Sequence, residues 1–151
     1  MGDRTWVVIT VLKESLDQVK EIFSDFYDIE IVEGDYLASL HFDEVNNGCV
    51  EEQDDLTEKG IPYNYEWGIG DNYDPGIKYI RFTPEGEVIH IEYYDSEVNP
   101  PLEKLTELLN EPEELVEFIR KFIEERTPLP WDNQVEYGKI YRARQLILAN
   151  T

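Results

Sequence analysis

The stretch RTWVVITVLKESLDQVKEIFSDF, residues 4–26, contains the change of hydrophobic period that decides the fold. Its first part, 4–12, is β-branched and apolar, which predicts a central strand. Its second part has apolar residues at the spacing of a helix, and Ser15 stands where an N-cap is expected. Those apolar residues are Leu16, Val19, Ile22, Phe23 and Phe26. We therefore expect the chain to begin with a strand followed by an amphipathic helix.

The next four segments are predicted, by the same criteria, to be strand, strand, helix and strand. They cover residues 29–33, 36–45, 48–60 and 61–67. The two strands form a hairpin turned at Gly34-Asp35, and Gly60 is well placed to end the acidic helix. The order strand, helix, strand, strand, helix, strand is that of the ferredoxin-like βαββαβ unit.

Further elements extend this unit. A hairpin is predicted over 77–94, because two alternating runs flank the turn Pro84-Glu85-Gly86. Prolines suited to a first helical turn introduce two helices within 101–126. The expected fold class is therefore α+β, with a ferredoxin-like unit extended by a hairpin and C-terminal helices.

The end of the chain is harder to interpret. Residues 127–138 are expected to form a loop, and the basic, apolar tail 139–149 fits no element clearly. No repeat or break in composition indicates a second domain. We predict one α+β domain over 1–151, with its core in 4–94 and the C-terminal helices and basic tail in 99–151.

The charge is the strongest signal in the composition. The 151 residues include 13 basic and 34 acidic ones, a net charge of −21, far beyond the magnitude of about 2–8 that keeps a small domain soluble. Residues 1–119 hold 7 basic and 30 acidic residues, whereas 120–151 hold 6 and 4. This distribution argues against direct binding of nucleic acid and favours a cationic partner. The alternative is a charge that only provides solubility or adaptation to salt.

Other features narrow the class of protein. The apolar fraction of 41% and the six Phe, ten Tyr and three Trp residues are enough for a folded core. No apolar run approaches the roughly 20 residues of a membrane span, and the start of the chain shows no signal-type segment. The lone Cys49 excludes an internal disulfide and fits a reducing compartment. We therefore expect a cytoplasmic protein.

Residues 63–82, YNYEWGIGDNYDPGIKYIRF, are the least ordinary stretch. Gly68 and Gly70 begin a dinucleotide fingerprint, but its third glycine is missing, and Asp71 and Asp74 would repel a pyrophosphate. The spacing matches neither a P-loop nor an EF-hand, so the two aspartates are at most weak cation ligands. The turn residues that follow them favour a simple turn into the next strand.

The aromatic residues before this loop share one face of their strand by alternation. They are Tyr63, Tyr65 and Trp67. Packing in a core and binding of a partner explain them about equally well.

The sequence shows no catalytic constellation. His41 and His90 are expected in strands, where a structural histidine is favoured over a general base. These histidines and Cys49 lack the spacing of a zinc motif, and Cys49 has no neighbouring base. We predict no catalytic residue, no metal and no cofactor, and hence a protein that is not an enzyme.

Trp131 lies in a polar loop between the predicted helices and the tail. Such a residue is either an anchor on the sheet or part of an interface, and the flanking Pro128 and Pro130 favour the anchor. Basic residues follow it and are expected to reach back to the acidic part of the chain. They are Lys139, Arg142 and Arg144.

Four segments carry a resemblance to a known family: FDEVNNG, GIPYNYEWGIGDNYDPG, RFTPEGEV and PLPWDNQVEYGKIYRARQ. They resemble a family of small acidic proteins carried on bacterial plasmids, phages and integrative elements. The likeness spans most of residues 36–145 and implies no catalytic or ligand residue, because that family has no assigned activity. By charge and size alone, the chain is also similar to DNA-mimicking inhibitors of restriction and CRISPR systems.

Two functional hypotheses follow. The first is a non-enzymatic inhibitor or immunity-type protein that binds a basic partner, such as a nuclease or another nucleic-acid-binding protein, by presenting carboxylates in place of phosphates. Its expected contact residues are Glu51, Glu52, Asp54, Asp55, Glu58, Tyr65, Trp67, Asp71, Asp74 and Trp131. The second is a small-ligand or cation-binding module, with or without enzymatic activity, that uses a cleft beside the 68–76 loop. A homodimer is compatible with both.

Overall fold

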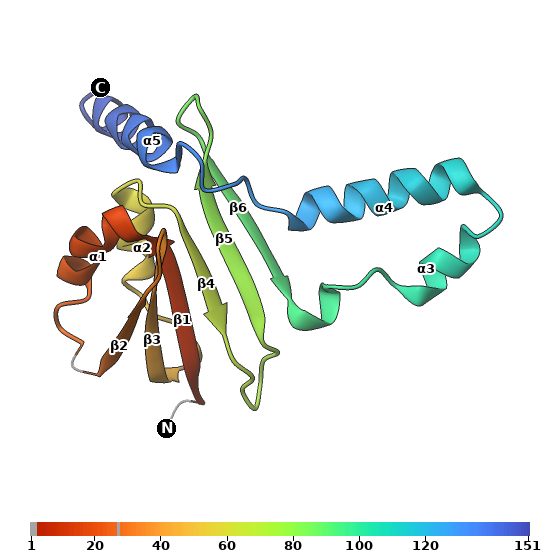
Figure 1. The fold of residues 1–151 in the computed structure, drawn as a ribbon, viewed down its shortest axis with the longest axis horizontal. Coiled ribbons are helices and arrows are strands. Elements are labelled where there is room, and N and C mark those ends of the chain that lie inside the picture. The colour runs from red at the N-terminus through yellow and green to blue at the C-terminus, as the bar shows by residue number, and fades with distance from the viewer. Residues whose placement is uncertain (1–2, 27) are drawn as a thin grey trace.

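The computed structural model describes residues 3–26 and 28–151, which contain one six-stranded sheet and the helices around it (Figure 1). The strands are β1 (Arg4–Leu12), β2 (Ile29–Glu33), β3 (Leu37–Asn46), β4 (Tyr63–Trp67), β5 (Gly76–Phe82) and β6 (Val88–Tyr94). The α-helices are α1 (Leu16–Ile22), α2 (Gln53–Glu58), α3 (Leu102–Glu107), α4 (Pro112–Arg126) and α5 (Gln134–Ala149). Two short 3-10 helices are η1 (Lys13–Ser15) and η2 (Asp95–Glu97).

The sheet is antiparallel throughout, and its strand order is β2-β3-β1-β4-β5-β6. β1 lies inside the sheet, paired with β3 on one side and β4 on the other. The predicted α+β class is confirmed. The complete order differs from that of a simple ferredoxin fold, because the β5–β6 hairpin pairs directly with β4 and adds two strands to the same sheet.

Alternate residues of the sheet face one core. Val7, Ile9 and Val11 of β1 are fully buried, whereas the residues between them are partly exposed. α1 and α2 cover this face of the sheet and contribute buried residues such as Val19 and Leu56. Full burial of one such aliphatic side chain contributes about 1.5–3 kcal/mol. The alternate, inward-facing residues of the strands therefore pack against the apolar sides of the two helices in a single core.

The ends of the first two helices correct the sequence predictions. Ser15 precedes α1, but its side chain is buried and makes no capping hydrogen bond. α2 begins at Gln53 instead of near residue 48, because Asn47 and Gly48 have positive φ angles of 55° and 62° and turn the chain out of β3 first. Gly60, with φ at 70°, ends the helix as predicted.

The predicted loop over 127–138 is also too long, because α5 begins at Gln134. The buried Gln134 side chain donates to the Phe82 carbonyl oxygen over 2.9 Å and accepts from the Phe82 amide over 2.8 Å. Gly138 lets α5 cross Gly60 closely, since a Cβ on Gly138 would lie 1.8 Å from the Gly60 oxygen. Gly138, a poor helix former, favoured a loop in the sequence prediction, but the close contact between α5 and Gly60 requires a glycine at this position.

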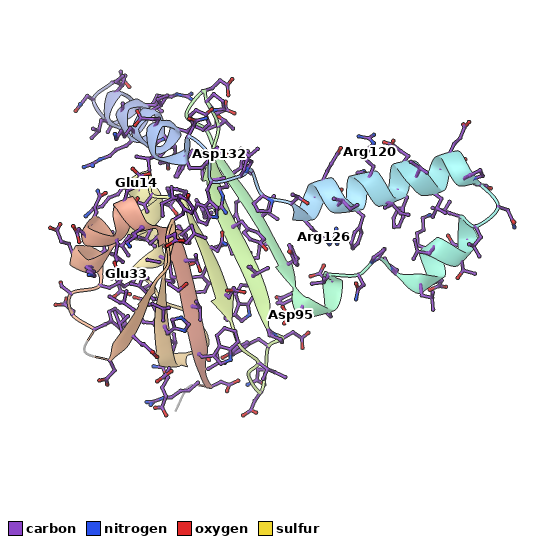
Figure 2. The ribbon with its side chains drawn as sticks, viewed as in Figure 1. Glu14, Glu33, Asp95, Arg120, Arg126 and Asp132 are labelled. Carbon is purple, nitrogen blue, oxygen red and sulfur yellow. The ribbon has the colours of Figure 1, made fainter. Side chains whose placement is uncertain are left out.

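Residues 101–126, called the arm below, contain α3 and α4 and extend beyond β6, away from the body formed by the six strands with α1, α2 and α5 (Figure 1). No residue of α4 is buried. The root of the arm touches the body at Arg126, whose Nε donates to the Glu97 carbonyl oxygen over 2.8 Å and whose guanidinium lies 6.0 Å from the centre of the Tyr93 ring. Figure 2 shows Arg120 and Arg126 on this helix.

Candidate functional site

An open groove lies where the end of α1 and the start of β2 meet the end of β3 and the turn into α2. Its volume is about 1040 Å³. Its floor is apolar: Phe26 and Phe42 pack edge to face with ring centres 5.4 Å apart, and Ile29, Val45 and Val50 continue the surface. Phe26 is 36% exposed, so part of this apolar floor is in contact with water.

Carboxylates surround this apolar floor. They are Asp25, Asp28, Asp43, Glu44, Glu51 and Glu52, and we call the whole feature the acidic groove. Arg4 pairs with Glu44 over 2.9 Å. Within residues 3–26 and 28–151, the other five carboxylates form no salt bridge. The acidic groove therefore joins a concentrated negative charge to an exposed apolar surface.

The turn from β3 into α2 shapes one wall of the groove. A Cβ on Gly48 would lie 3.2 Å from Thr5 Cγ2 and 3.3 Å from Trp67 Cβ, so the chain passes close to the sheet here. The Tyr65 hydroxyl donates to the Gly48 carbonyl oxygen over 2.6 Å and accepts from the Val50 amide over 2.8 Å. Burial raises the pKa of Tyr65 well above its usual range, so the hydroxyl keeps its proton for this contact.

This geometry gives Tyr65 a structural place. Its side chain is 3% exposed and is part of the core, so it is not on the surface that a partner would meet. Of the predicted contact residues, Glu51 and Glu52 line the acidic groove. Asp54, Asp55 and Glu58 are exposed on the adjoining α2 and, among the described residues, take part in no salt bridge.

Trp67 belongs to a second, smaller feature. Its Nε1 donates to the Asp74 carbonyl oxygen over 2.8 Å, which ties the 68–76 loop to the strand. A pocket of about 300 Å³ opens beside it, lined by Tyr65, Trp67, Tyr73 and Tyr94 together with polar residues. The side chains of Asp71 and Asp74 are exposed and are not among the residues that line this pocket.

Lys78 is the cation of this pocket. Its Nζ lies 5.4 Å from the centre of the Tyr63 ring and 5.2 Å from that of Tyr65, and it donates to Oε1 of Gln53. Desolvation lowers the pKa of Lys78, and the nearby Glu92 carboxylate opposes that shift. The pocket thus combines four aromatic rings with one lysine and one glutamate.

Trp131 packs on the sheet, apart from both features. The Arg81 guanidinium lies 3.7 Å from the centre of its ring, and Arg81 Nε donates to the Leu129 carbonyl oxygen over 2.9 Å. Burial lowers the pKa of Arg81 to about 10, and the neighbouring Tyr79 opposes that shift. Trp131 is half-buried in this stack. The sequence allowed either an anchor on the sheet or an interface residue, and this packing favours the anchor.

Of the basic residues after Trp131, Arg144 reaches back to the β5–β6 turn, as expected, whereas Lys139 pairs within its own helix. Arg144 donates to the carbonyl oxygens of Glu85 and Gly86 over 2.8 and 3.4 Å, and Lys139 pairs with Glu136 over 3.1 Å within α5. They do not neutralise the acidic groove. In the described ranges, no group of three or more His, Cys, Asp or Glu side chains is arranged to hold a metal ion, and no helix is long and apolar enough to cross a membrane.

Sequence reasoning missed part of the site. Asp25, Asp28, Asp43 and Glu44 join Glu51 and Glu52 in the groove. They come from three separate segments, and in so acidic a chain no local pattern marks them. Comparison with protein-family models, with curated proteins and with solved structures finds no match for this chain.

Proposed function

We propose that this chain is a non-enzymatic binding protein that inhibits or neutralises a basic, nucleic-acid-binding protein through the acidic groove and the adjoining face of α2. The observation that carries the proposal is the groove itself: five carboxylates that form no salt bridge with any described residue surround an apolar floor. A partner segment with Lys or Arg residues beside apolar ones matches both properties. The charges accelerate and orient association, and the apolar floor slows dissociation.

The body's other properties support a charge-driven mode of binding. The net charge of −21 creates a long-range field that attracts a cationic surface and repels nucleic acid. In this mode of binding, the exposed carboxylates of α2 take the place of the phosphates of a nucleic acid. This arrangement favours the groove and α2 as a phosphate-like surface over a charge that only provides solubility.

The proposal extends to fold type and setting. We extend the proposal to a ferredoxin-like unit within the sheet, which the position of β1 between β3 and β4, and of β3 between β1 and β2, supports. The resemblance of four segments to proteins of plasmids, phages and integrative elements suggests an anti-defence or immunity-type role. The lone Cys49 favours a reducing, cytoplasmic setting.

A capture experiment tests the proposal. The protein is immobilised, exposed to a bacterial lysate, and washed at about 50 mM and about 500 mM salt. A groove variant carries Asp25→Asn, Asp28→Asn, Asp43→Asn, Glu51→Gln and Glu52→Gln. A control of equal charge carries Gln in place of five exposed glutamates outside the groove: Glu85, Glu87, Glu103, Glu113 and Glu114.

The expected result is a basic protein that the parent and the control retain at low salt, and that the groove variant loses. Retention by all three decreases at high salt, because exposed ion pairs are screened. Equal retention by the groove variant and the control at low salt would show that the groove does not bind the partner.

The pocket beside the 68–76 loop supports a second candidate function, binding of a small ligand. Its volume of about 300 Å³ is at the lower end of the range for ligand sites, roughly 300–1,000 Å³. Aromatic walls with Lys78 and Glu92 suit a flat, zwitterionic or anionic molecule. A thermal-shift screen of such compounds on the parent, on Lys78→Met and on the control Lys59→Met tests this function. A shift that only Lys78→Met loses supports it, and the absence of any shift contradicts it.

A further inference from the structure

The arm presents an apolar ridge that is exposed among the described residues. Val116, Ile119 and Ile123 lie at positions i, i+3 and i+7 of α4, on one side of the helix, and are 65%, 37% and 55% exposed. An isolated helix of about 12–15 residues is marginal in water and draws its stability mainly from packing of its apolar face. α4, with 15 residues and none buried, therefore needs a surface to pack on.

The body presents a sheet face of matching character. The side of the sheet opposite α1 and α2 carries Ile77 and Tyr79 of β5 beside Tyr93, Ile91 and Ile89 of β6. Trp6 on the same side is 49% exposed. The root of the arm lies against this side at Tyr93 and the Trp131 segment lies against it at Arg81, and its β5 and β6 residues are half-buried. We call it the open face.

A copy's own arm does not reach its own open face. α4 remains helical up to Arg126, which is fixed to Glu97 and rests on Tyr93, and from this root the helix runs outward beyond β6 (Figure 1). To fold back across β5 and β4, it would have to break its last turn and the Arg126 contacts. The surface that covers the arm therefore comes from another molecule.

We infer that two copies of this chain form a two-fold symmetric dimer in which the arm of each copy lies across the open face of the other. The chain carries both an exposed helix ridge and a sheet face of matching character. In a two-fold symmetric dimer, the ridge of each copy packs on the sheet face of the other, so the same contact forms twice. Each copy contributes one side of its 26-residue arm together with its open face, and a stable interface takes roughly 20–30 residues from each partner. The anchoring residues are apolar and aromatic, as in the centres of such interfaces.

The salt dependence of this dimer is opposite to that of partner binding. The arm holds 4 basic and 8 acidic residues, and residues 1–99 hold 6 and 24, so the arm of one copy and the body of the other carry net charges of the same sign and repel each other. Salt screens that repulsion and leaves the apolar contacts in place. The dimer therefore tightens as salt rises, whereas a complex in the acidic groove weakens. The inference does not rest on the proposed function, and this difference separates the two.

The first test is the molar mass of the full chain by sedimentation equilibrium at about 0.5 M salt, near 100 µM protein. We expect twice the chain mass of 17.8 kDa. Val116→Lys combined with Ile123→Lys weakens the dimer by about 100-fold or more. Both side chains are exposed in the single chain, so the variant still folds. The control Glu114→Lys, on the side of α4 opposite the ridge, changes the net charge by the same two units and remains dimeric.

A cross-linking experiment identifies the two surfaces. In a Cys49→Ser background, one protein carries Ile119→Cys and another carries Ile91→Cys, and the two are mixed under oxidising conditions. A disulfide between the two different variants supports packing of the arm on the sheet. A parent chain of 17.8 kDa at every concentration, a double-lysine variant that stays dimeric, or disulfides only between two Ile119→Cys chains would each overturn the inference.

Discussion

α2 and α4 are both acidic helices, but they depend on different interactions. α2 has six residues and buries Leu56 completely, and within 3–26 and 28–151 its carboxylates form no salt bridge. α4 has 15 residues and buries none. It places Arg120 within 2.5 Å of Glu117 and 2.8 Å of Glu124. α2 is stabilised by the burial of Leu56 in the core and does not need its carboxylates in order to fold. Those carboxylates are therefore available to bind a partner. α4 uses its charge to stabilise itself, and its apolar ridge remains available instead.

The largest difference between these helices is expected on truncation of a leucine in each. Leu56→Ala in α2 leaves a cavity in the core and lowers the free energy of unfolding by about 3 kcal/mol. Leu115→Ala in α4, where the side chain is only half-buried, lowers it by about 1 kcal/mol or less. Urea unfolding at low protein concentration measures both. Equal losses would show that the arm packs as tightly as the body in a single chain.

A second comparison sets α5 against α4, the two long helices. Gln134→Ala removes both hydrogen bonds to Phe82 and leaves a buried amide and carbonyl without partners. We expect a loss of about 2–4 kcal/mol in the free energy of unfolding. The exposed control Arg142→Ala in the same helix changes it by less than about 0.5 kcal/mol. A small effect of Gln134→Ala would mean that α5, like α4, is only loosely attached.

Carboxylates on the open face and on the arm should respond to pH in opposite directions. Burial raises the pKa of Glu66, with a further increase from Asp95, so the folded state loses stability as pH rises through that pKa. Hydrogen bonding to Arg120 lowers the pKa of Glu117, so its contribution to stability is present above its unfolded pKa and is lost as pH falls. Glu66→Gln therefore raises the thermal midpoint at pH 7, and Glu117→Gln lowers it.

Both differences should disappear when the carboxyl groups are protonated. Thermal unfolding at a series of pH values between 3 and 8, with the exposed Glu30→Gln as a control, measures them. If Glu66→Gln and Glu117→Gln both raised, or both lowered, the thermal midpoint at pH 7, the predicted opposite pH responses of these two carboxylates would be wrong.

The smallest effect is expected from α2 itself. Asp55→Asn removes one of several neighbouring like charges and so raises the thermal midpoint slightly at low salt. Because the repulsion is screened, the gain disappears at about 0.5 M salt. Differential scanning calorimetry at both salt concentrations measures it. A lower midpoint for Asp55→Asn at low salt would show that the carboxylate is paired after all, which would weaken it as a contact for a partner.

The sheet and four of the helices were predictable because each has a local signal. A β-branched, apolar run marks β1, the period of two marks β5 and β6, and prolines mark the starts of α3 and α4. α5 was missed because Gly138, a poor helix former, is required by a contact with Gly60 that lies 78 positions earlier. No window of sequence contains that contact.

The site was predictable only where its residues are consecutive. The carboxylates of α2 form a local run, whereas Asp25, Asp28 and Asp43 reach the groove through the pairing of β2 with β3. Tyr65 and Trp67 were correctly placed on one face of their strand, but alternation does not say which face a helix covers. The covered face turned out to be theirs, which placed Tyr65 inside the core.

The hydrogen bonds between Gln134 and Phe82 also have a consequence for how the protein is made. The two residues are 52 positions apart, so the end of β5 cannot satisfy its backbone until residue 134 has left the ribosome. During that interval the arm is synthesised while the Phe82 backbone still lacks its Gln134 partner. Nascent chains that stop before residue 134 expose an unpaired edge at Phe82, where chaperones and proteases can distinguish them from finished molecules.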